Sequence, residues 1–205
     1  ELDAHRQQAV SVLTDPKVRR AFDVERADPK TLARYGKNKF GLSVLMGKRL
    51  IEAGVNLVQV NLGKNSSWDT HRRNFVNLKD NLLPPYDKCI SALLDDMSAS
   101  GQLDETLVIV AGEFGRTPKI NTSAGRDHWP TAGPICFAGA GTPPGRVIGK
   151  TDATGARPVG KEYYSEDIAA TIYAKLGIPL DTLHVTGDGR PVQVCDGNVI
   201  PELMS

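Results

Sequence analysis

The chain has 205 residues, of which 40% are hydrophobic and 24% are charged, and its formal net charge at pH 7 is +1. This length supports one domain with a sizeable core, and the near-zero charge gives no electrostatic reason to bind nucleic acid or an anionic membrane. No apolar run approaches the roughly 20 residues that a membrane-spanning helix requires. We therefore expect a globular protein with no nucleic-acid partner and no membrane insertion. Its three cysteines are far apart and lack the spacing of a metal site or a disulfide framework.

The first 38 residues are predicted to form a helical lead-in. Asp15-Pro16 and Asp28-Pro29 each place a capping carboxylate immediately before a proline at the first helical position. Gly36 follows the second of these helices and is expected to end it. These signals predict two short helices ahead of the main body of the chain.

After the lead-in, apolar periodicity predicts helices that alternate with strands. The helical segments have apolar residues at three- and four-residue spacing, whereas the strand candidates are short apolar runs. In chain order the predicted elements are a helix at 39–53, a strand at 55–62, helical structure at 72–100 divided by Pro84-Pro85, strands at 106–111 and 134–138, an extended loop or hairpin at 139–162, a helix at 165–176 and short β segments around 191–194.

This order of elements predicts an α/β fold, in which right-handed crossovers give a largely parallel sheet flanked by helices. We expect residues 1–205 to form a single domain or fragment, with the lead-in at 1–38 and the body at 39–205. Charged residues gather just after the predicted strands, and open α/β proteins usually bind their ligands at such strand ends.

Asp69 and His71 follow the predicted strand at 55–62 and are two residues apart. In an extended segment such residues point the same way, so both side chains could reach one cation. A mixed carboxylate and imidazole shell suits zinc and other divalent transition metals. The commoner explanation of an Asp-x-His loop is a turn-capping aspartate beside an exposed histidine, and the spacing alone leaves both open.

A second group of candidate ligands lies between the predicted strands at 106–111 and 134–138. His128 lies in a loop rich in Gly, Asp and Pro, as active-site residues often do, and its neighbour Asp127 could bind a second cation or orient an imidazole. Glu113 directly follows a strand that is expected to be buried, where a carboxylate needs a cationic partner or a metal. The predicted metal ligands are therefore Asp69, His71, Glu113, Asp127 and His128.

Two arginines, Arg116 and Arg126, accompany these candidate ligands. A guanidinium fork suits a pair of phosphate or sulfate oxygens, so both arginines are predicted to bind a substrate anion. The alternative is a purely structural ion network, in which the arginines pair with Glu113 and the Asp127-His128 pair holds the loop. The residues alone leave both explanations open.

Several long motifs from about residue 40 onward resemble an uncharacterised bacterial family of sulfatase-like domains, grouped with the alkaline phosphatase superfamily. The motifs that carry the resemblance are Trp68-Asp69-Thr70-His71, Gly112-Glu113-Phe114-Gly115-Arg116-Thr117-Pro118, Gly125-Arg126-Asp127-His128-Trp129-Pro130, Arg146-Val147-Ile148-Gly149, Thr151-Asp152-Ala153-Thr154-Gly155 and the helix from Glu166 to Tyr173.

The resemblance implies an alkaline phosphatase-like α/β core with metal ligands at the carboxyl ends of its strands. It assigns Asp69 and His71 to the first pair of ligands and His128 to the last. Glu113 stands where that superfamily usually has Asp, and Phe114 where it usually has His. One imidazole of the usual two-zinc site is therefore missing, and Asp127 is the candidate replacement.

The resemblance also implies a function. The superfamily's nucleophile follows an early strand, and no such segment precedes residue 40, so the chain resembles a carboxyl-terminal portion with an incomplete core. We expect a zinc-dependent hydrolase-like domain for phosphate or sulfate esters of small molecules or glycans, inactive as this fragment. The alternative is a non-catalytic member that binds an anion, a glycan or a protein. Members of the family are often exported, which is the only indication of location.

Overall fold

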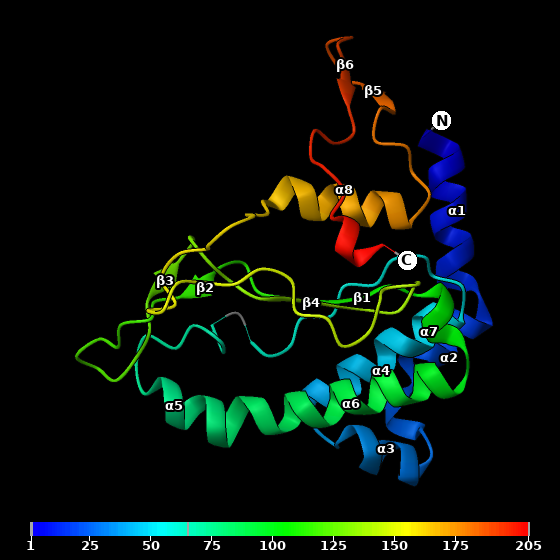
Figure 1. Cartoon of the computed structure of the whole chain (residues 1–205). Helices are drawn as coiled ribbons and strands as arrows, with labels where there is room; N and C mark the ends of the chain where they lie inside the picture. The colour runs from blue at the N-terminus through cyan, green and yellow to red at the C-terminus, as the bar shows by residue number, and fades with distance from the viewer. Residues whose placement is uncertain (1, 65, 205) are drawn as a thin grey trace. The chain divides into compact units, whose positions relative to one another are not determined.

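A computed structural model of the protein describes residues 2–64 and 66–204 (Figure 1). The chain divides into two compact units, and each is described by itself. The first unit comprises Glu1–Met97 with Asn121–Gly125, and the second comprises Ser98–Ile120 with Arg126–Ser205. No helix among the described residues combines the length and the apolar character needed to cross a membrane.

The first unit is helical. The proline-based capping signals of the lead-in are confirmed, because the Asp15 carboxylate accepts a hydrogen bond from the Lys17 amide at 2.6 Å and the Asp28 carboxylate accepts one from the Thr31 amide at 2.9 Å. The helices are α1 (Leu2–Thr14), α2 (Pro16–Phe22), the 3-10 helix η1 (Val24–Arg26), α3 (Pro29–Tyr35), α4 (Lys39–Glu52), α5 (Asn74–Val76), the π-helix η2 (Asn77–Leu82) and α6 (Leu83–Ala99).

The hydrophobic core of the first unit contains buried residues of α3, α4 and α6, which are labelled in Figure 1. The side chains of Val60 and Leu62, in the segment after α4, pack against this core. Burial of this apolar surface is the main stabilising contribution to the unit. The buried members of the core are Val24, Ala27, Tyr35, Val44, Leu45, Cys89 and Ala92.

The prediction of a strand at 55–62 is wrong. These residues form no strand in the part of the chain that the structure describes, although they run in an extended conformation after α4. Val58 and Val60 lie against Gly47 of α4, where the absence of a side chain leaves room for them. The alternation of apolar residues therefore reflects packing against a helix rather than membership of a sheet.

Pro84 and Pro85 do not divide the helical segment as predicted. Helices α5, η2 and α6 follow one another without a break, and the π-helix η2 ends at Leu82, two residues before the first proline. A proline ring clashes with the carbonyl four residues earlier in an α-helix and offers no N–H to bond it. The wider π turn relieves this clash, so the helix continues through both prolines.

All the strands among the described residues lie in the second unit, and they form three separate antiparallel pairs: β1 with β4, β2 with β3, and β5 with β6. The register of the first pair places Val108 opposite Ala138 and Ala111 opposite Ile135. The elements are α7 (Gln102–Glu105), β1 (Val108–Ala111), β2 (Gly115–Arg116), β3 (His128–Trp129), β4 (Ile135–Ala138), α8 (Ser165–Lys175), β5 (Leu183–Val185), β6 (Pro191–Gln193) and the 3-10 helix η3 (Pro201–Leu203).

The expected α/β fold with a largely parallel, alkaline phosphatase-like sheet is therefore wrong. The predicted strand at 55–62, which would have begun the sheet, is not a strand. The strands β1 and β4 are joined by a segment that contains only β2, β3 and loops. Because no crossover helix intervenes, the chain returns beside β1 in the opposite direction, and the pair is antiparallel.

Helix α8 and the carboxyl-terminal segment pack together inside the second unit. Ala170 and Thr171 of α8 are fully buried, and the Thr171 hydroxyl accepts a hydrogen bond from the Ile200 amide at 2.9 Å. The Asp167 carboxylate caps the amino-terminal end of α8 by accepting from the Tyr164 amide at 3.0 Å. The helix runs from Ser165 to Lys175 with Tyr164 at its N-cap, so the predicted helix at 165–176 is confirmed.

Candidate functional site

Asp69 and His71 lie in the loop before α5, and their side chains meet. His71 Nε2 is 3.0 Å from Asp69 Oδ1, and the two side chains are 41% and 39% exposed respectively. This confirms the expectation that the two side chains point the same way. In a tetrahedral zinc site with bonds of 2.0–2.1 Å, neighbouring ligand atoms are separated by about 3.3 Å. The observed separation is close to that value, so one cation could be bound by both atoms.

Trp68 and Thr70, the residues that alternate with Asp69 and His71, hold this loop in place because their side chains contact other residues of the first unit. The Trp68 indole N–H donates to the Leu62 carbonyl at 2.6 Å, and its ring packs edge-on against Tyr86, with centroids 5.9 Å apart. Thr70 is buried, and its hydroxyl donates to the side-chain oxygen of Asn74. Alternate residues of the loop therefore anchor it in the first unit, while Asp69 and His71 are presented to solvent.

A second loop, residues 121–125, belongs to the same unit and docks on the segment that follows His71. The Arg73 amide donates to the Ser123 carbonyl at 3.0 Å, and the Asn74 amide donates to the Ala124 carbonyl at 2.9 Å. This loop lies three residues before His128 in the chain. It therefore connects the region of His71 covalently to the segment that contains the next candidate ligand.

His128 is the first residue of β3 in the second unit, where it lies opposite Arg116 of β2. The Phe114 ring packs on the imidazole, with centroids 4.2 Å apart and an interplanar angle of 41°. The next residue, Trp129, donates from its indole N–H to the Ala156 carbonyl at 2.7 Å. Strand pairing, the phenyl ring and the tryptophan anchor thus restrict the orientation of His128.

Asp69, His71 and His128 form a candidate metal-binding triad, each with one ligand atom to offer. Asp69 and His128 are exposed and His71 is half-buried, so a cation and its further ligands could enter from solvent. Three protein ligands with positions left for water or substrate are typical of catalytic rather than structural zinc sites. Nothing in the triad identifies the metal.

The structure does not bring the other two predicted ligands into this group. Glu113 is exposed rather than buried, so it has no desolvation cost that a metal would have to relieve. Asp127 is half-buried, and its backbone exchanges hydrogen bonds with Thr117, at 2.9 Å and 3.1 Å. The metal-binding roles of Glu113 and Asp127 remain predictions.

Arg116 and Arg126 use part of their hydrogen-bonding capacity on the backbone of the second unit. Arg126 Nη1 donates to the carbonyls of Thr117 and Pro118 at 2.7 Å and 3.0 Å, and Arg116 Nη1 donates to the Arg126 carbonyl at 3.3 Å. The Arg116 guanidinium also lies over the Phe114 ring, 5.8 Å from its centroid. Both side chains thus help to shape the loop, and their anion-binding role remains a prediction.

Two cationic residues that the sequence analysis did not single out are Arg72 and Arg73. They directly follow His71 in the first unit, and both are exposed. Arg73 has a left-handed backbone conformation with φ of 49°, which is unusual for a residue with a long side chain. The sequence signal for them is their position directly after a candidate ligand.

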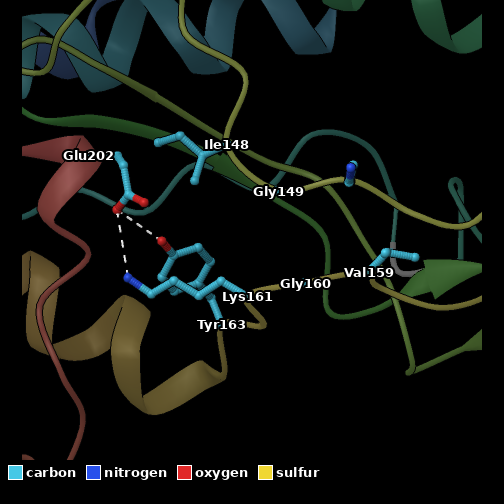
Figure 2. A pocket seen from close by; sticks show the side chains of 8 residues that line it. Ile148, Gly149, Val159, Gly160, Lys161, Tyr163 and Glu202 are labelled. Carbon is cyan, nitrogen blue, oxygen red and sulfur yellow. Dashed lines mark hydrogen bonds and ion pairs between the residues drawn. The ribbon is translucent and has the colours of Figure 1, made fainter.

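The second unit has a separate open hollow of about 330 Å³ beside the start of α8 and η3 (Figure 2). Tyr163 donates to Glu202 Oε2 at 2.9 Å, and Lys161 Nζ lies 4.0 Å from the same oxygen. The backbone N–H of Glu202 and the Tyr163 hydroxyl lower the pKa of this carboxyl. These polar groups satisfy one another, and we assign the network to holding η3 beside α8.

The fold and the site define a mixed α and β protein with a candidate metal centre formed by loop residues and a short strand. The chain belongs to the family described as Protein of unknown function (DUF1501), which matches residues 1–204. No curated protein and no solved structure matches the chain.

This family membership corrects the resemblance drawn from the motifs. The match is to a family of unknown function, and nothing in it points to sulfatases or to the alkaline phosphatase superfamily. Glycine, aspartate, histidine and arginine recur in many ligand-binding loops because each suits tight turns or polar ligands. Short motifs of these residues therefore indicated a candidate site without defining an ancestry.

Proposed function

We propose that Asp69, His71 and His128 bind one divalent metal ion, and that the protein uses it to hydrolyse a phosphate or sulfate ester. The observation that carries the proposal is the pairing of Asp69 Oδ1 with His71 Nε2 at 3.0 Å on an exposed loop. A carboxylate with two imidazoles is a ligand set that suits zinc, which we propose as the metal.

The chain itself supports the participation of His128. Gly125 packs against the backbone of His71, and His128 follows it by only three residues. Three extended residues span at most about 11 Å, so the covalent link limits how far His128 can be from the Asp69–His71 pair. This constraint depends only on contacts inside the first unit and on the length of the chain.

The proposed substrate is anionic because of the charges beside the ligands. Arg72 and Arg73 are exposed next to His71, and no ion pair occupies them among the described residues. Guanidinium groups bind phosphate and sulfate oxygens with two parallel hydrogen bonds. A bound metal would polarise the ester oxygen and lower the pKa of a bound water.

The attacking group in this proposal is water, and two hydroxyls of the loop, those of Ser67 and Thr70, are engaged in other hydrogen bonds. Thr70 is buried and donates to Asn74, and Ser67 Oγ accepts from the Lys64 amide at 2.8 Å. The same observation favours a second candidate function, a metal-dependent binder of anionic ligands that does no chemistry. Both functions require the metal, and only the first requires turnover.

Metal binding is tested by equilibrium dialysis of the full chain against zinc, followed by elemental analysis. We expect about one zinc ion per chain in the wild-type protein and loss of that ion in a His71→Ala, His128→Ala double variant. A His184→Ala variant is the matched control, because His184 is an exposed histidine of β5 outside the triad. Undiminished zinc in the double variant would overturn the site.

Catalysis is tested with the zinc-loaded protein and two chromogenic substrates, p-nitrophenyl phosphate and p-nitrophenyl sulfate. Turnover that disappears in the double variant and on chelation supports the hydrolase. Zinc binding without turnover, together with zinc-dependent binding of inorganic phosphate or sulfate, supports the non-catalytic alternative instead.

A further inference from the structure

Asn121 makes an unusually complete set of side-chain hydrogen bonds for a loop residue. Its side-chain oxygen accepts from the amides of Ser123 and Gly125, both at 2.9 Å. Its side-chain nitrogen donates to the carbonyl of His71 at 3.0 Å. One amide group thus closes the turn at 121–125 and ties that turn to the backbone of a candidate metal ligand.

The backbone of the 121–125 turn lies close to the backbone of His71 and of the residues that follow it. A side chain at Gly125 would place its Cβ 1.9 Å from the His71 carbonyl oxygen, so only glycine allows the two backbones to approach this closely. Arg73 and Ala124, which lie on the two sides of the contact, both have left-handed backbone conformations, with φ of 49° and 54°. Both residues take part in hydrogen bonds across the contact, because the Arg73 amide donates to the Ser123 carbonyl and the Ala124 carbonyl accepts from the Asn74 amide. Such conformations persist only where the surrounding contacts hold them.

We infer that Asn121 is a positioning residue for the metal site: it fixes the turn from which the chain reaches His128 beside the backbone of His71. This inference rests on the proposed function. If the turn were released from His71, the chain between Gly125 and His128 would start from many positions, and capturing His128 at the metal would cost more conformational entropy. Partners that orient metal ligands from outside the coordination shell typically contribute 10–100-fold in metal affinity.

The test measures Co²⁺ affinity by its visible absorption in three variants of the full chain. Asn121→Ala is expected to weaken binding by about tenfold or more. Asn121→Asp keeps the acceptor for the two amides of the turn but cannot donate to the His71 carbonyl, so we expect it to weaken binding as well. Asn77→Ala is the matched control, because Asn77 also donates to a backbone carbonyl next to the site, that of Arg72 at 3.2 Å, without touching the turn.

A positioning role also predicts a dependence on His128. In a His128→Ala background, Asn121→Ala is expected to weaken Co²⁺ binding no further, because the turn no longer leads to a ligand. Loss of fold is checked by circular dichroism, and loss of the contact by hydrogen exchange at the amides of Arg73 and Asn74, which bond to the turn.

The outcomes separate this inference from the proposed function. If the wild-type protein binds no Co²⁺, the metal site itself is wrong. If it binds Co²⁺ and folded Asn121→Ala binds equally well, or if Asn77→Ala weakens binding as much, Asn121 is not a positioning residue. An equal effect of Asn121→Ala with and without His128 would likewise overturn the role.

Discussion

At the residue scale, the site depends on small groups that allow close approach rather than on the charged residues alone. Gly125 is buried against the carbonyl of His71, and the side chain of Asn121 supplies the bonds that hold it there. Neither residue offers a metal ligand or a charge. They determine where the chain leading to His128 begins, which is a purely geometric contribution.

A Gly125→Ala substitution is expected to destabilise the protein by about 1–3 kcal/mol, because the new methyl group overlaps the His71 carbonyl and forces the two backbones apart. Urea unfolding followed by circular dichroism measures the change. The control is Gly187→Ala, where nothing lies within 4 Å of the added atom and we expect no loss of stability. Equal stabilities of the two variants would contradict the close contact.

The cysteines differ sharply in their surroundings, and this predicts their reactivity. Cys89 is buried at 0% exposure in the core of the first unit, whereas Cys136 is exposed on β4. Burial raises the pKa of the Cys89 thiol to about 11. At pH 8 its thiolate fraction is then about 0.1%, and the thiolate is the reactive form.

We therefore expect a thiol reagent such as DTNB to label Cys136 in the native protein at once and Cys89 only after unfolding. Peptide mapping by mass spectrometry identifies the labelled residues. A guanidinium-unfolded sample, in which every thiol is accessible, is the control. Labelling of Cys89 at the rate of Cys136 in the native state would show that the core of the first unit is open.

At the element scale, helix ends follow the local sequence, whereas strand partners do not. The capping carboxylates of α2 and α3 act within three residues of their positions in the chain, so the sequence was enough to place them. The cap of helix α8 also contacts a residue far away in the chain. Asp167 accepts from the Tyr164 amide and also from the Asn198 amide at 2.8 Å, which joins the helix to the carboxyl-terminal segment.

These two amide donors lower the pKa of Asp167, with the Tyr164 amide as the larger cause. A lowered folded-state pKa stabilises the protein above the unfolded value of 3.8, and this contribution is lost as the pH falls through the folded pKa. We expect Asp167→Asn to be less stable than the wild type at pH 7, and the difference to shrink as the pH falls below 3.8 through the lowered pKa of the folded state.

The measurement for Asp167 is thermal unfolding of both proteins at a series of pH values. Asp181→Asn is the control, because Asp181 is an exposed carboxylate that accepts no hydrogen bond among the described residues. Its stability relative to the wild type is expected to stay constant. If the stability difference between Asp167→Asn and the wild type does not change with pH, the charge of the Asp167 carboxylate does not contribute to the cap.

At the scale of the whole molecule, metal binding should appear as a gain in stability. A ligand that binds only the folded state stabilises it by an amount that grows with its free concentration, about 2.7 kcal/mol at 100 times the dissociation constant. We therefore expect zinc to raise the Tm of the wild-type protein and EDTA to reverse the increase. Asp69→Ala is expected to lose most of the effect, whereas Asp104→Ala, at an exposed acid of α7, is expected to keep it.

The sequence predicted the helices of the first unit and the strands at 106–111 and 134–138, because each depends on neighbours within a few residues, whereas for Asp69 and His71 it left two explanations open. It did not predict the π-helix before Pro84, which arises from a steric conflict spread over two turns of helix. Nor did it predict the roles of Gly125 and Asn121. Their partner, His71, lies about fifty residues away in the chain, and no local pattern indicates such a contact.

The sequence by itself determined where the capped helices α2 and α3 begin, because capping is a local property. It indicated the strands at 106–111 and 134–138, but it also indicated a strand at 55–62 that the structure does not contain. Only the tertiary structure decided how the strands pair and which residues meet. Pairing direction depends on the path between strands, and the path from β1 to β4 contains no crossover helix. The exposure of Glu113 was likewise decided by the tertiary structure. The sequence predicted a buried carboxylate after a buried strand, but in the structure this carboxylate is exposed.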